Sequence, residues 1–281
     1  MKAKIFLVVC MLFSLTNIKA HSESEVVSQK RTWIDLAAFD KLQINIPAQV
    51  VVEQSDSFAV SIEAASKLQE KLKIEVFDGR LTISLRGSSI KMKRSSMFIR
   101  IKAPIIKHYD VNGSGKVVVN YAVRTEDDAF TATVNGSGSV SVARVETSKF
   151  TAKVNGSGKI NCGAVAAREA AHIVVNGSGK AHVGNMVSMT THLTLHGSGK
   201  VNADRVATPN LKASISGSGR IAVGGVADKT YFEVLGSGVI DAPNLETNEI
   251  NNKKWKSEMK NKVVSFKMHA QLTKYNFQTI T

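Results

Sequence analysis

The chain has 281 residues, and its 37 Lys and Arg against 23 Asp and Glu give a formal net charge of +14. A chain of this length can form one large domain or two ordinary ones. Its two cysteines are Cys10 and Cys162; Cys10 lies in the leader described next, so an internal disulfide is excluded from the mature protein.

Residues 1–20 have the features of a secretory signal peptide. Lys2 and Lys4 precede an apolar stretch from Ile5 to Leu15, and Ala20 offers a cleavage site. The apolar stretch is about half of the roughly 20 residues that a membrane-spanning helix needs. Cleavage removes three lysines, leaving 37 − 3 = 34 basic residues against 23 acidic ones, a charge of +11. We expect a cationic protein exported to the periplasm, the cell surface or the medium, with no transmembrane segment after the leader is removed.

Alternation of apolar and polar residues begins after a polar stretch. Residues 21–32 are expected to form a flexible mature N-terminus. From residue 33 the chain alternates, as in Leu42-Ile44-Ile46 and Leu81-Ile83-Leu85. A period of two is typical of strands with one buried face. Residues 33–110 are therefore predicted to form irregular coils that lead into a repeat array.

The tripeptide Gly-Ser-Gly occurs seven times between residues 113 and 238. The intervals between its first glycines are 23, 20, 21, 20, 20 and 19 residues. These structural bend positions are Gly113, Gly136, Gly156, Gly177, Gly197, Gly217 and Gly236. A period near 20 residues is typical of a β-helix, an all-β solenoid in which each repeat buries its apolar face against its neighbours.

The pattern around the tripeptide predicts the path of each coil. Apolar residues stand two and four positions before the first glycine, and again four and six positions after it, so a strand enters and a strand leaves the bend. Gly, Asp and Pro collect seven and eight positions after the glycine, where we expect a corner followed by a short third strand. Both glycines are assigned to the inward side of the bend, where a Cβ atom would be crowded.

The Gly-Ser-Gly-Lys sequences do not match the known loops that bind phosphate or calcium. A P-loop needs an earlier glycine and a Ser or Thr after the lysine, and a dinucleotide fingerprint needs a third glycine and a following helix. Calcium-binding repeats place aspartate beside the glycines, whereas this chain has Asn, Ser and Lys there. We expect no cofactor. The asparagines directly before the tripeptide are predicted to stack as a ladder and are Asn112, Asn135, Asn155 and Asn176.

Basic residues recur three positions after the first glycine. Coils that stack about 4.8 Å apart would align them into one ladder, interrupted by Ser139 and followed by Val239. This candidate polyanion-binding ladder consists of Lys116, Lys159, Lys180, Lys200 and Arg220. It is either a solvated face that discourages sheet aggregation or a track for an anionic glycan, a lipid headgroup or another polyanion. Nucleic acid is poorly supported, because no aromatic residues interleave with the lysines.

Catalysis and metal binding have weak support in the sequence. His172, His192 and His196 could share one outward patch, but no carboxylate ladder lies beside them, and ordinary surface histidines are the favoured interpretation. Glycan cleavage requires paired carboxylates. Glu146 and Glu246 occupy equivalent positions, but the four repeats between them carry Ala or Val there. We expect no catalytic residues and no metal site.

The last segment, residues 246–281, departs from the repeat pattern. Trp255, Met259, Val263 and Phe266 follow one another at helical spacing among many lysines. The segment could cap the solenoid, lie on a surface as a basic amphipathic helix, or form a loose or strand-forming tail.

The chain resembles one known family over residues 33–245. The resemblance rests on "FDKLQINIPAQVVVEQS", "LKIEVFDGRLTISL" and "FIRIKAPIIKHYDVNGSGKVVV", followed by the run of Gly-Ser-Gly repeats. The family is the "putative auto-transporter adhesin, head GIN domain" group of exported bacterial proteins. The resemblance implies a right-handed parallel β-helix and a non-catalytic adhesion or binding role in the bacterial envelope. A carbohydrate-active β-helix enzyme and a purely structural envelope protein are the alternatives.

Overall fold

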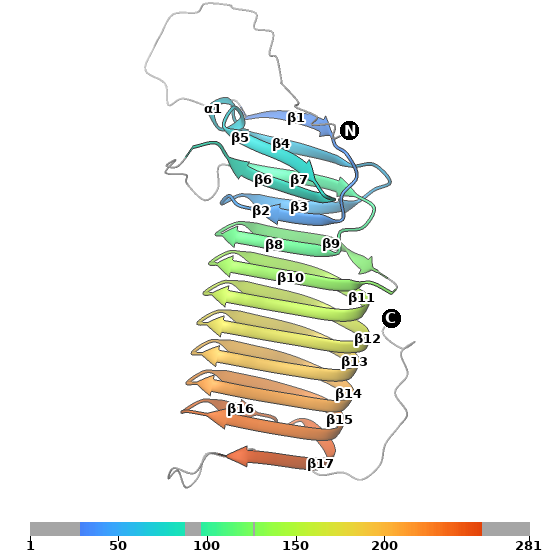
Figure 1. Cartoon of the computed structure of the whole chain (residues 1–281), viewed down its shortest axis with the longest axis vertical. Helices are drawn as coiled ribbons and strands as arrows, with labels where there is room; N and C mark the ends of the chain where they lie inside the picture. Colours follow the sequence, from blue (N-terminus) through green and yellow to red (C-terminus); the bar gives the residue numbers. More distant parts are fainter. Residues whose placement is uncertain (1–28, 88–96, 126, 255–281) are drawn as a thin grey trace, which may run out of the picture.

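The computed structural model describes residues 29–87, 97–125 and 127–254. The leader predicted at residues 1–20 and residues 255–281 of the predicted C-terminal segment lie outside the described residues. The described chain forms an elongated stack of coils in which every strand belongs to one 17-stranded sheet (Figure 1). No helix in the described part is long and apolar enough to cross a bilayer.

Antiparallel strands close the N-terminal end of the stack. The elements there are β1 (Gln29–Asp35), β2 (Lys41–Ile44), β3 (Gln49–Gln54), β4 (Ala59–Ala65), α1 (Ser66–Gln69), β5 (Leu72–Phe77), β6 (Arg80–Leu85) and β7 (Met97–Ala103). β4 runs antiparallel to both β1 and β7, and β5 runs antiparallel to β6. The predicted entry coils are partly present: β2 and β3 run parallel to β8 and β9 of the first repeat, and β6 and β7 run parallel to β2 and β3 in the next layer, whereas β1, β4 and β5 depart from the parallel pattern.

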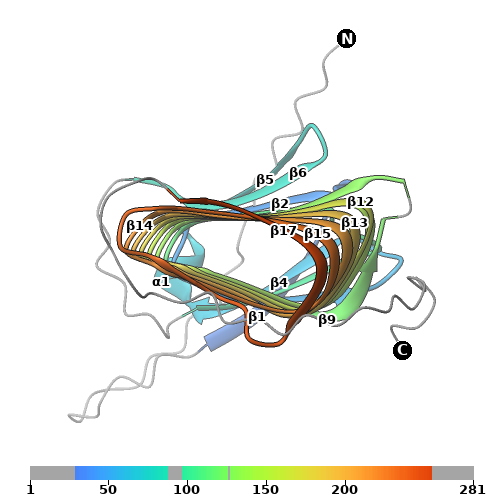
Figure 2. The same cartoon turned by 90° about the horizontal axis from the view of Figure 1, so that it is seen from below.

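The β5–β6 pair is a hairpin that projects from the side of the stack (Figure 2). Its turn is Asp78-Gly79, and both residues have positive φ, 49° and 67°. Two consecutive residues of positive φ define the turn type whose twist matches that of antiparallel strands, and Asp-Gly favours it. The sequence therefore contains a local signal for this hairpin, which the periodicity of apolar residues does not reveal.

The repeats form parallel coils, as predicted. Their strands are β8 (His108–Gly113), β9 (Lys116–Arg124), β10 (Ala129–Gly136), β11 (Ser139–Gly156), β12 (Lys159–Gly177), β13 (Lys180–Gly197), β14 (Lys200–Gly217), β15 (Arg220–Leu235), β16 (Val239–Asp241) and β17 (Leu245–Lys254). Every pairing among them is parallel. From β11 to β14 one long curved strand runs from each Gly-Ser-Gly bend to the next, and these bends lie along the edge where the arrowheads end in Figure 1.

Each coil has two further corners besides the bend. The ladder between β11 and β12 passes from Val142–Cys162 directly to Arg144–Ala164, so the predicted corner position seven residues after the glycine is skipped. A second irregularity lies between Thr147 and Lys149. The corners give the coil a flattened, closed outline when viewed along the stack (Figure 2). The predicted third side is thus present, although the strand continues through both corners.

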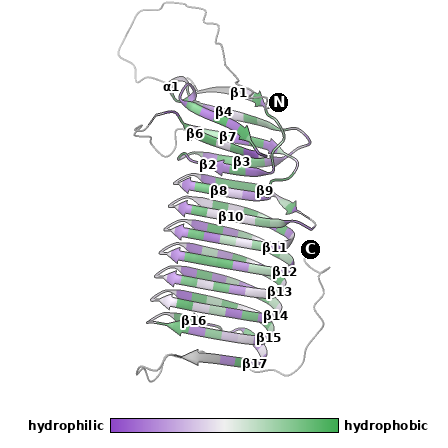
Figure 3. Ribbon diagram, in the orientation of Figure 1, coloured by the Kyte–Doolittle hydropathy of each residue, from purple (hydrophilic) through white to green (hydrophobic). Residues whose placement is uncertain are grey.

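Apolar side chains fill the inside of the coils. Hydrophilic and hydrophobic residues alternate along the strands (Figure 3), and the inward members are buried. The rings of Phe130 and Phe150 stack with centroids 5.7 Å apart. A fully buried residue of this kind stabilises the fold by about 1.5–3 kcal/mol. Cys162 lies in the same interior, where burial raises the pKa of its thiol to about 12, so the thiol stays protonated.

A column of buried hydroxyl groups lines the second corner. Its members are Thr125, Thr147, Ser188, Thr208 and Thr247. Thr125 Oγ1 donates to Thr147 Oγ1 over 2.8 Å, and Thr147 Oγ1 donates to the carbonyl of Asp128 over 2.7 Å. Such bonds satisfy polar groups where the backbone turns away from the regular ladder. Five of the seven repeats have Thr, Ser or Ala eleven residues after the first glycine, a recurrence that the prediction did not use, and Thr125 lies twelve residues after Gly113.

The two glycines of each bend have different roles, which corrects the prediction that both face inward. Gly158 is buried, and a Cβ there would lie 2.4 Å from Cγ1 of Val134 in the previous coil. Gly156 is exposed and has a φ of +117°, and a Cβ there would lie 2.8 Å from the carbonyl oxygen of Gly136. From Gly136 onward the first glycine is therefore required by its backbone conformation and by the close approach of the neighbouring backbone, whereas at Gly113 the backbone conformation alone restricts the residue.

Replacing Gly156 by Ala should destabilise the protein more than the same change at Gly113. A Cβ at Gly113 has no atom within 4 Å, so Gly113→Ala carries only the cost of a positive φ, about 1–2 kcal/mol. Gly156→Ala adds overpacking of about 1–3 kcal/mol. Urea unfolding of the two variants measures the difference. Equal losses would show that contact with the previous coil does not restrict this position.

Candidate functional site

The Gly-Ser-Gly bends bring three rows of polar side chains onto one edge of the stack. We call this the bend edge, which comprises the residue before each first glycine, the serine, and the residue three positions after the first glycine. The backbone is bonded from coil to coil here, since Ser137 N donates to Gly113 O over 2.8 Å and Lys159 N donates to Gly138 O over 3.0 Å. Equivalent bonds recur along the edge, so equivalent side chains are held in register.

The first row is the predicted asparagine ladder. Each side-chain amide donates to the Oδ1 of the asparagine one coil closer to the N-terminus, over 2.7–2.9 Å. The members are Asn45, Asn112, Asn135, Asn155 and Asn176. Asn45 extends the predicted ladder by one coil, where Ile46, Pro47 and Ala48 stand in register with a Gly-Ser-Gly tripeptide. Because this coil lacks the tripeptide, the spacing of the Gly-Ser-Gly repeats does not predict it.

The second row consists of the tripeptide serines at the outermost point of the bends. Six of the seven are exposed, and these are Ser137, Ser157, Ser178, Ser198, Ser218 and Ser237. Their hydroxyl groups can both donate and accept hydrogen bonds. The serine row lies between the asparagine ladder and the basic residues, so the middle of the bend edge offers neutral polar groups at a constant spacing.

The third row contains all five residues of the predicted basic ladder, and each is exposed. Lys159 pairs in register with Lys180, Lys180 with Lys200, and Lys200 with Arg220. Ser139 stands between Lys116 and Lys159, as the repeat spacing predicts.

Most of the positive charge on this ladder is uncompensated. In the described part of the chain, none of the four lysines has a carboxylate within ion-pair distance; only Arg220 has one, with 3.3 Å between its Nη1 and Oδ2 of Asp241. Two like charges on adjacent strands, about 4.8 Å apart, repel by about 1 kcal/mol in water, and salt reduces this repulsion. An anion placed between two lysines would relieve it. The ladder is therefore chemically suited to bind anions.

A shallow depression of about 380 Å³ lies at the N-terminal end of the basic ladder. It is lined by Pro47, Ala48, Gln49, Ser114, Lys116, Ser137, Gly138 and Ser139. Its position coincides with the interruption of the ladder, because the short side chain of Ser139 leaves room between Lys116 and Lys159. The lining offers one ammonium group, several hydroxyl groups and one amide.

The three histidines, which the sequence allowed to share one patch, do not lie together. His172 and His192 lie on adjacent strands with ring centroids 4.8 Å apart. His196 lies four residues further along the strand, in the row of the asparagine ladder. Within residues 29–254, as far as they are described, no cluster of three potential metal ligands is present. Burial lowers the pKa of His192, and the neighbouring His172 and Lys212 lower it further.

The chain has clear similarity to one family and to several solved structures. The model of the family described as "Putative auto-transporter adhesin, head GIN domain" matches residues 38–202 and 164–257. A putative adhesin from Parabacteroides merdae ATCC 43184 superposes with a TM-score of 0.71 at 16% identity, covering 86% of this chain and 94% of its own. A putative adhesin from Parabacteroides distasonis ATCC 8503 gives a TM-score of 0.73 at 18% identity, with coverages of 87% and 98%.

A third similar structure, also from Parabacteroides distasonis ATCC 8503, is described as a "Putative lipid binding protein". Its TM-score is 0.64 at 19% identity, and the match covers 76% of this chain and 96% of that one. No curated protein matches the chain. At these identities the structures establish a shared fold.

The lowered pKa of His192 predicts a pH-dependent stability. The unfolded chain binds the proton more readily than the folded protein, so stability falls as the pH drops below 6.5 and levels off below the lowered pKa. His192→Thr introduces the residue that stands at the equivalent position Thr151, and it should reduce the change in the free energy of unfolding with pH. Urea unfolding from about pH 7.5 to about pH 5 measures it. His196→Ser is the control, since it leaves the His172–His192 contact intact; equal slopes for His192→Thr and the unmodified protein would contradict the assignment.

Proposed function

The chain belongs to the family of "putative auto-transporter adhesin, head GIN domain" proteins, and we propose that it is an exported, non-catalytic module that attaches to anionic glycans through the basic ladder of its bend edge. The observation that carries the proposal is the register of Lys159, Lys180, Lys200 and Arg220 on four adjacent strands. Such a ladder is suited to a ligand with many negative charges.

A polymer gains more from this ladder than a small anion does. Each exposed cation attracts an anion only weakly in water, but cations on adjacent coils act together on one chain of linked charges. The neighbouring hydroxyl groups and amides supply hydrogen bonds to the uncharged part of a glycan. An anionic envelope surface presents the same kind of repeated charge and is covered by the same proposal.

The lining of the depression at the bend edge, and of a second depression on the flank of the last coils, supports binding rather than hydrolysis. Glycoside hydrolysis uses two carboxyl groups that flank the scissile bond. The depression at the bend edge has no carboxylate in its lining, and the second depression has one, Glu249. This carboxylate is in an ion pair, with 3.8 Å between the Nζ atom of Lys229 and Oε2 of Glu249, and the lining of the depression contains no second carboxylate.

Changing Lys159, Lys180, Lys200 and Arg220 to Gln should abolish binding to a linear polyanion. We expect the unmodified protein to bind immobilised heparin and to elute at a salt concentration that falls sharply in this variant, because several contacts weaken together. Stability should change little, since an exposed substitution shifts the free energy of unfolding by about ±0.5 kcal/mol. Salt-gradient elution and urea unfolding provide the two measurements.

A matched control removes the same charges elsewhere. Lys71, Lys149, Lys153 and Arg86 are exposed and lie off the bend edge. Like Arg220 in the ladder, one of them is in an ion pair, with 3.2 Å between the Nζ of Lys149 and Oε2 of Glu169. Changing these four to Gln should leave most of the heparin binding. An equal loss in both variants would mean that net charge alone holds the polymer and would refute the ladder. Anionic and neutral phospholipid vesicles test whether an anionic membrane surface binds the same residues.

A further inference from the structure

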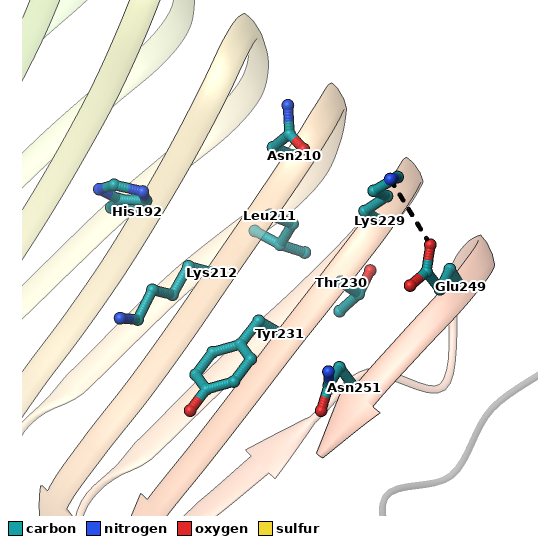
Figure 4. Close-up of a pocket in the computed structure, with 9 residues that line it drawn as sticks. All are labelled: His192, Asn210, Leu211, Lys212, Lys229, Thr230, Tyr231, Glu249 and Asn251. Atoms are coloured by element: carbon teal, nitrogen blue, oxygen red, sulfur yellow. Dashed lines mark ion pairs between the residues drawn. The ribbon is translucent and has the colours of Figure 1, made fainter. Parts of the chain in front are cut away.

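A depression on the flank of the last coils is separate from the bend edge. It has a volume of about 230 Å³ and is formed by β13, β14, β15 and β17 (Figure 4). We call it the flank depression, and it is lined by His192, Asn210, Leu211, Lys212, Lys229, Thr230, Tyr231, Glu249 and Asn251. Leu211 and Thr230 are buried beneath it, so its walls are two rows of outward side chains.

The two rows have different chemistry. One contains Asn210 and the ion pair between Lys229 and Glu249, whose side chains point toward each other in Figure 4. The other contains Lys212 and Tyr231, and the Nζ atom of Lys212 lies 5.2 Å from the centroid of the Tyr231 ring. A cation at this distance is attracted to the aromatic face. Among the described residues, Lys212 has no carboxylate partner, so its charge is available to a ligand.

The repeat does not require these residues. The column that contains Lys212 keeps no single residue type along the stack. From the N-terminal end its members are Lys41, His108, Thr131, Thr151, His172, His192, Lys212, Tyr231 and Asn251, and Tyr231 is the one aromatic ring of the Phe, Trp or Tyr type among them. The outward rows of the bend edge, by contrast, keep one residue type over several coils. Every position in the column is an outward strand position, so stacking of the coils accepts threonine as well as tyrosine. The concentration of an aromatic ring, a free ammonium group and two amides at one depression therefore points to a ligand.

We propose that the flank depression binds one acidic sugar residue, a hexuronic acid. An aromatic ring offers a flat apolar surface for the C–H face of a sugar. The ammonium group of Lys212, which lies over the ring of Tyr231, would meet the sugar carboxylate in a charge-assisted hydrogen bond, and the sugar would lie against the part of the ring that Lys212 leaves open. Asn210 and Asn251 can each donate and accept, and Glu249 accepts, so the sugar hydroxyl groups find partners of both kinds. A few polar groups around an aromatic surface are typical of small-molecule sites.

This inference is independent of the basic ladder. The ladder lies three residues after the bend, and the flank depression lies on the strands that approach the bend five to seven residues before it. The ladder offers charge alone and favours a polymer, whereas the flank depression has the size and the mixed chemistry for one sugar ring. The two sites can therefore be tested separately.

The test is an NMR titration of the full mature protein with three probes. Glucuronate carries both the sugar ring and the carboxylate, glucose carries the ring alone, and acetate carries the carboxylate alone. We expect glucuronate to give saturable shifts of the amide signals of residues 210–212 and 229–231, with glucose and acetate each binding at least about tenfold more weakly. Glucuronate and acetate of equal affinity, or shifts confined to other residues, would overturn the proposal.

Two variants and one control separate this site from general charge effects. Lys212→Gln should remove the preference for glucuronate over glucose, and Tyr231→Ser should weaken both sugars. Lys153→Gln removes one exposed charge from an earlier coil and should leave the titration unchanged. The quadruple Gln variant of the basic ladder should also keep glucuronate binding; its loss there, or equal effects of Lys212→Gln and Lys153→Gln, would refute a site at the flank depression. Urea unfolding verifies that each variant is folded.

Discussion

Hydrogen bonding between successive coils is the constraint on which the rest of this structure depends. Each coil accepts and donates backbone bonds at the same positions as its neighbours, and at the bend the carbonyl of a first glycine accepts from the next coil. This close approach leaves no room for a Cβ at Gly156 or Gly158. The same contacts hold the side chains of the bend edge one strand spacing apart, about 4.8 Å. A functional surface with a constant repeat is thus a direct result of how the backbone is satisfied.

The sequence predicts the parts of the fold that depend on periodicity. The spacing of the first glycines indicated stacked coils, and the alternation around them indicated which residues, such as Val134 and Val154, are buried. The sequence predicted the fold less well where a local turn, or a coil without the tripeptide, interrupts the repeat. Asp78-Gly79 forms a hairpin, and Asn45 belongs to a coil without the tripeptide. The outward orientation of Gly156 does not follow from the alternation of apolar and polar residues, because this alternation assigns a face only while the chain stays extended, and Gly156 has a positive φ.

The two candidate sites differ in how far sequence could reach them. The basic ladder repeats with the coil, so its members could be aligned by counting from one glycine to the next. The flank depression joins Lys212 and Tyr231 to Lys229 and Glu249, which lie in two different rows on three coils. The curvature of the coil between its corners decides which rows of side chains form a depression. The spacing of residues in the sequence does not predict this curvature. Regular positions therefore carry the scaffold and a repeated charge, and irregular ones carry local chemistry.

The asparagine ladder gives the bend edge a direction. Every side-chain amide from Asn112 to Asn176 donates toward the N-terminal end, so the amide dipoles are aligned head to tail and polarise one another. The row ends at one side in Asn45, which accepts bonds from both Asn112 and Gln43, and at the other in the Oδ1 of Asn176, which faces the coil of His196. The two ends of the edge are electrically different. A polysaccharide, whose two ends are also chemically different, would therefore meet a surface that distinguishes its two possible orientations.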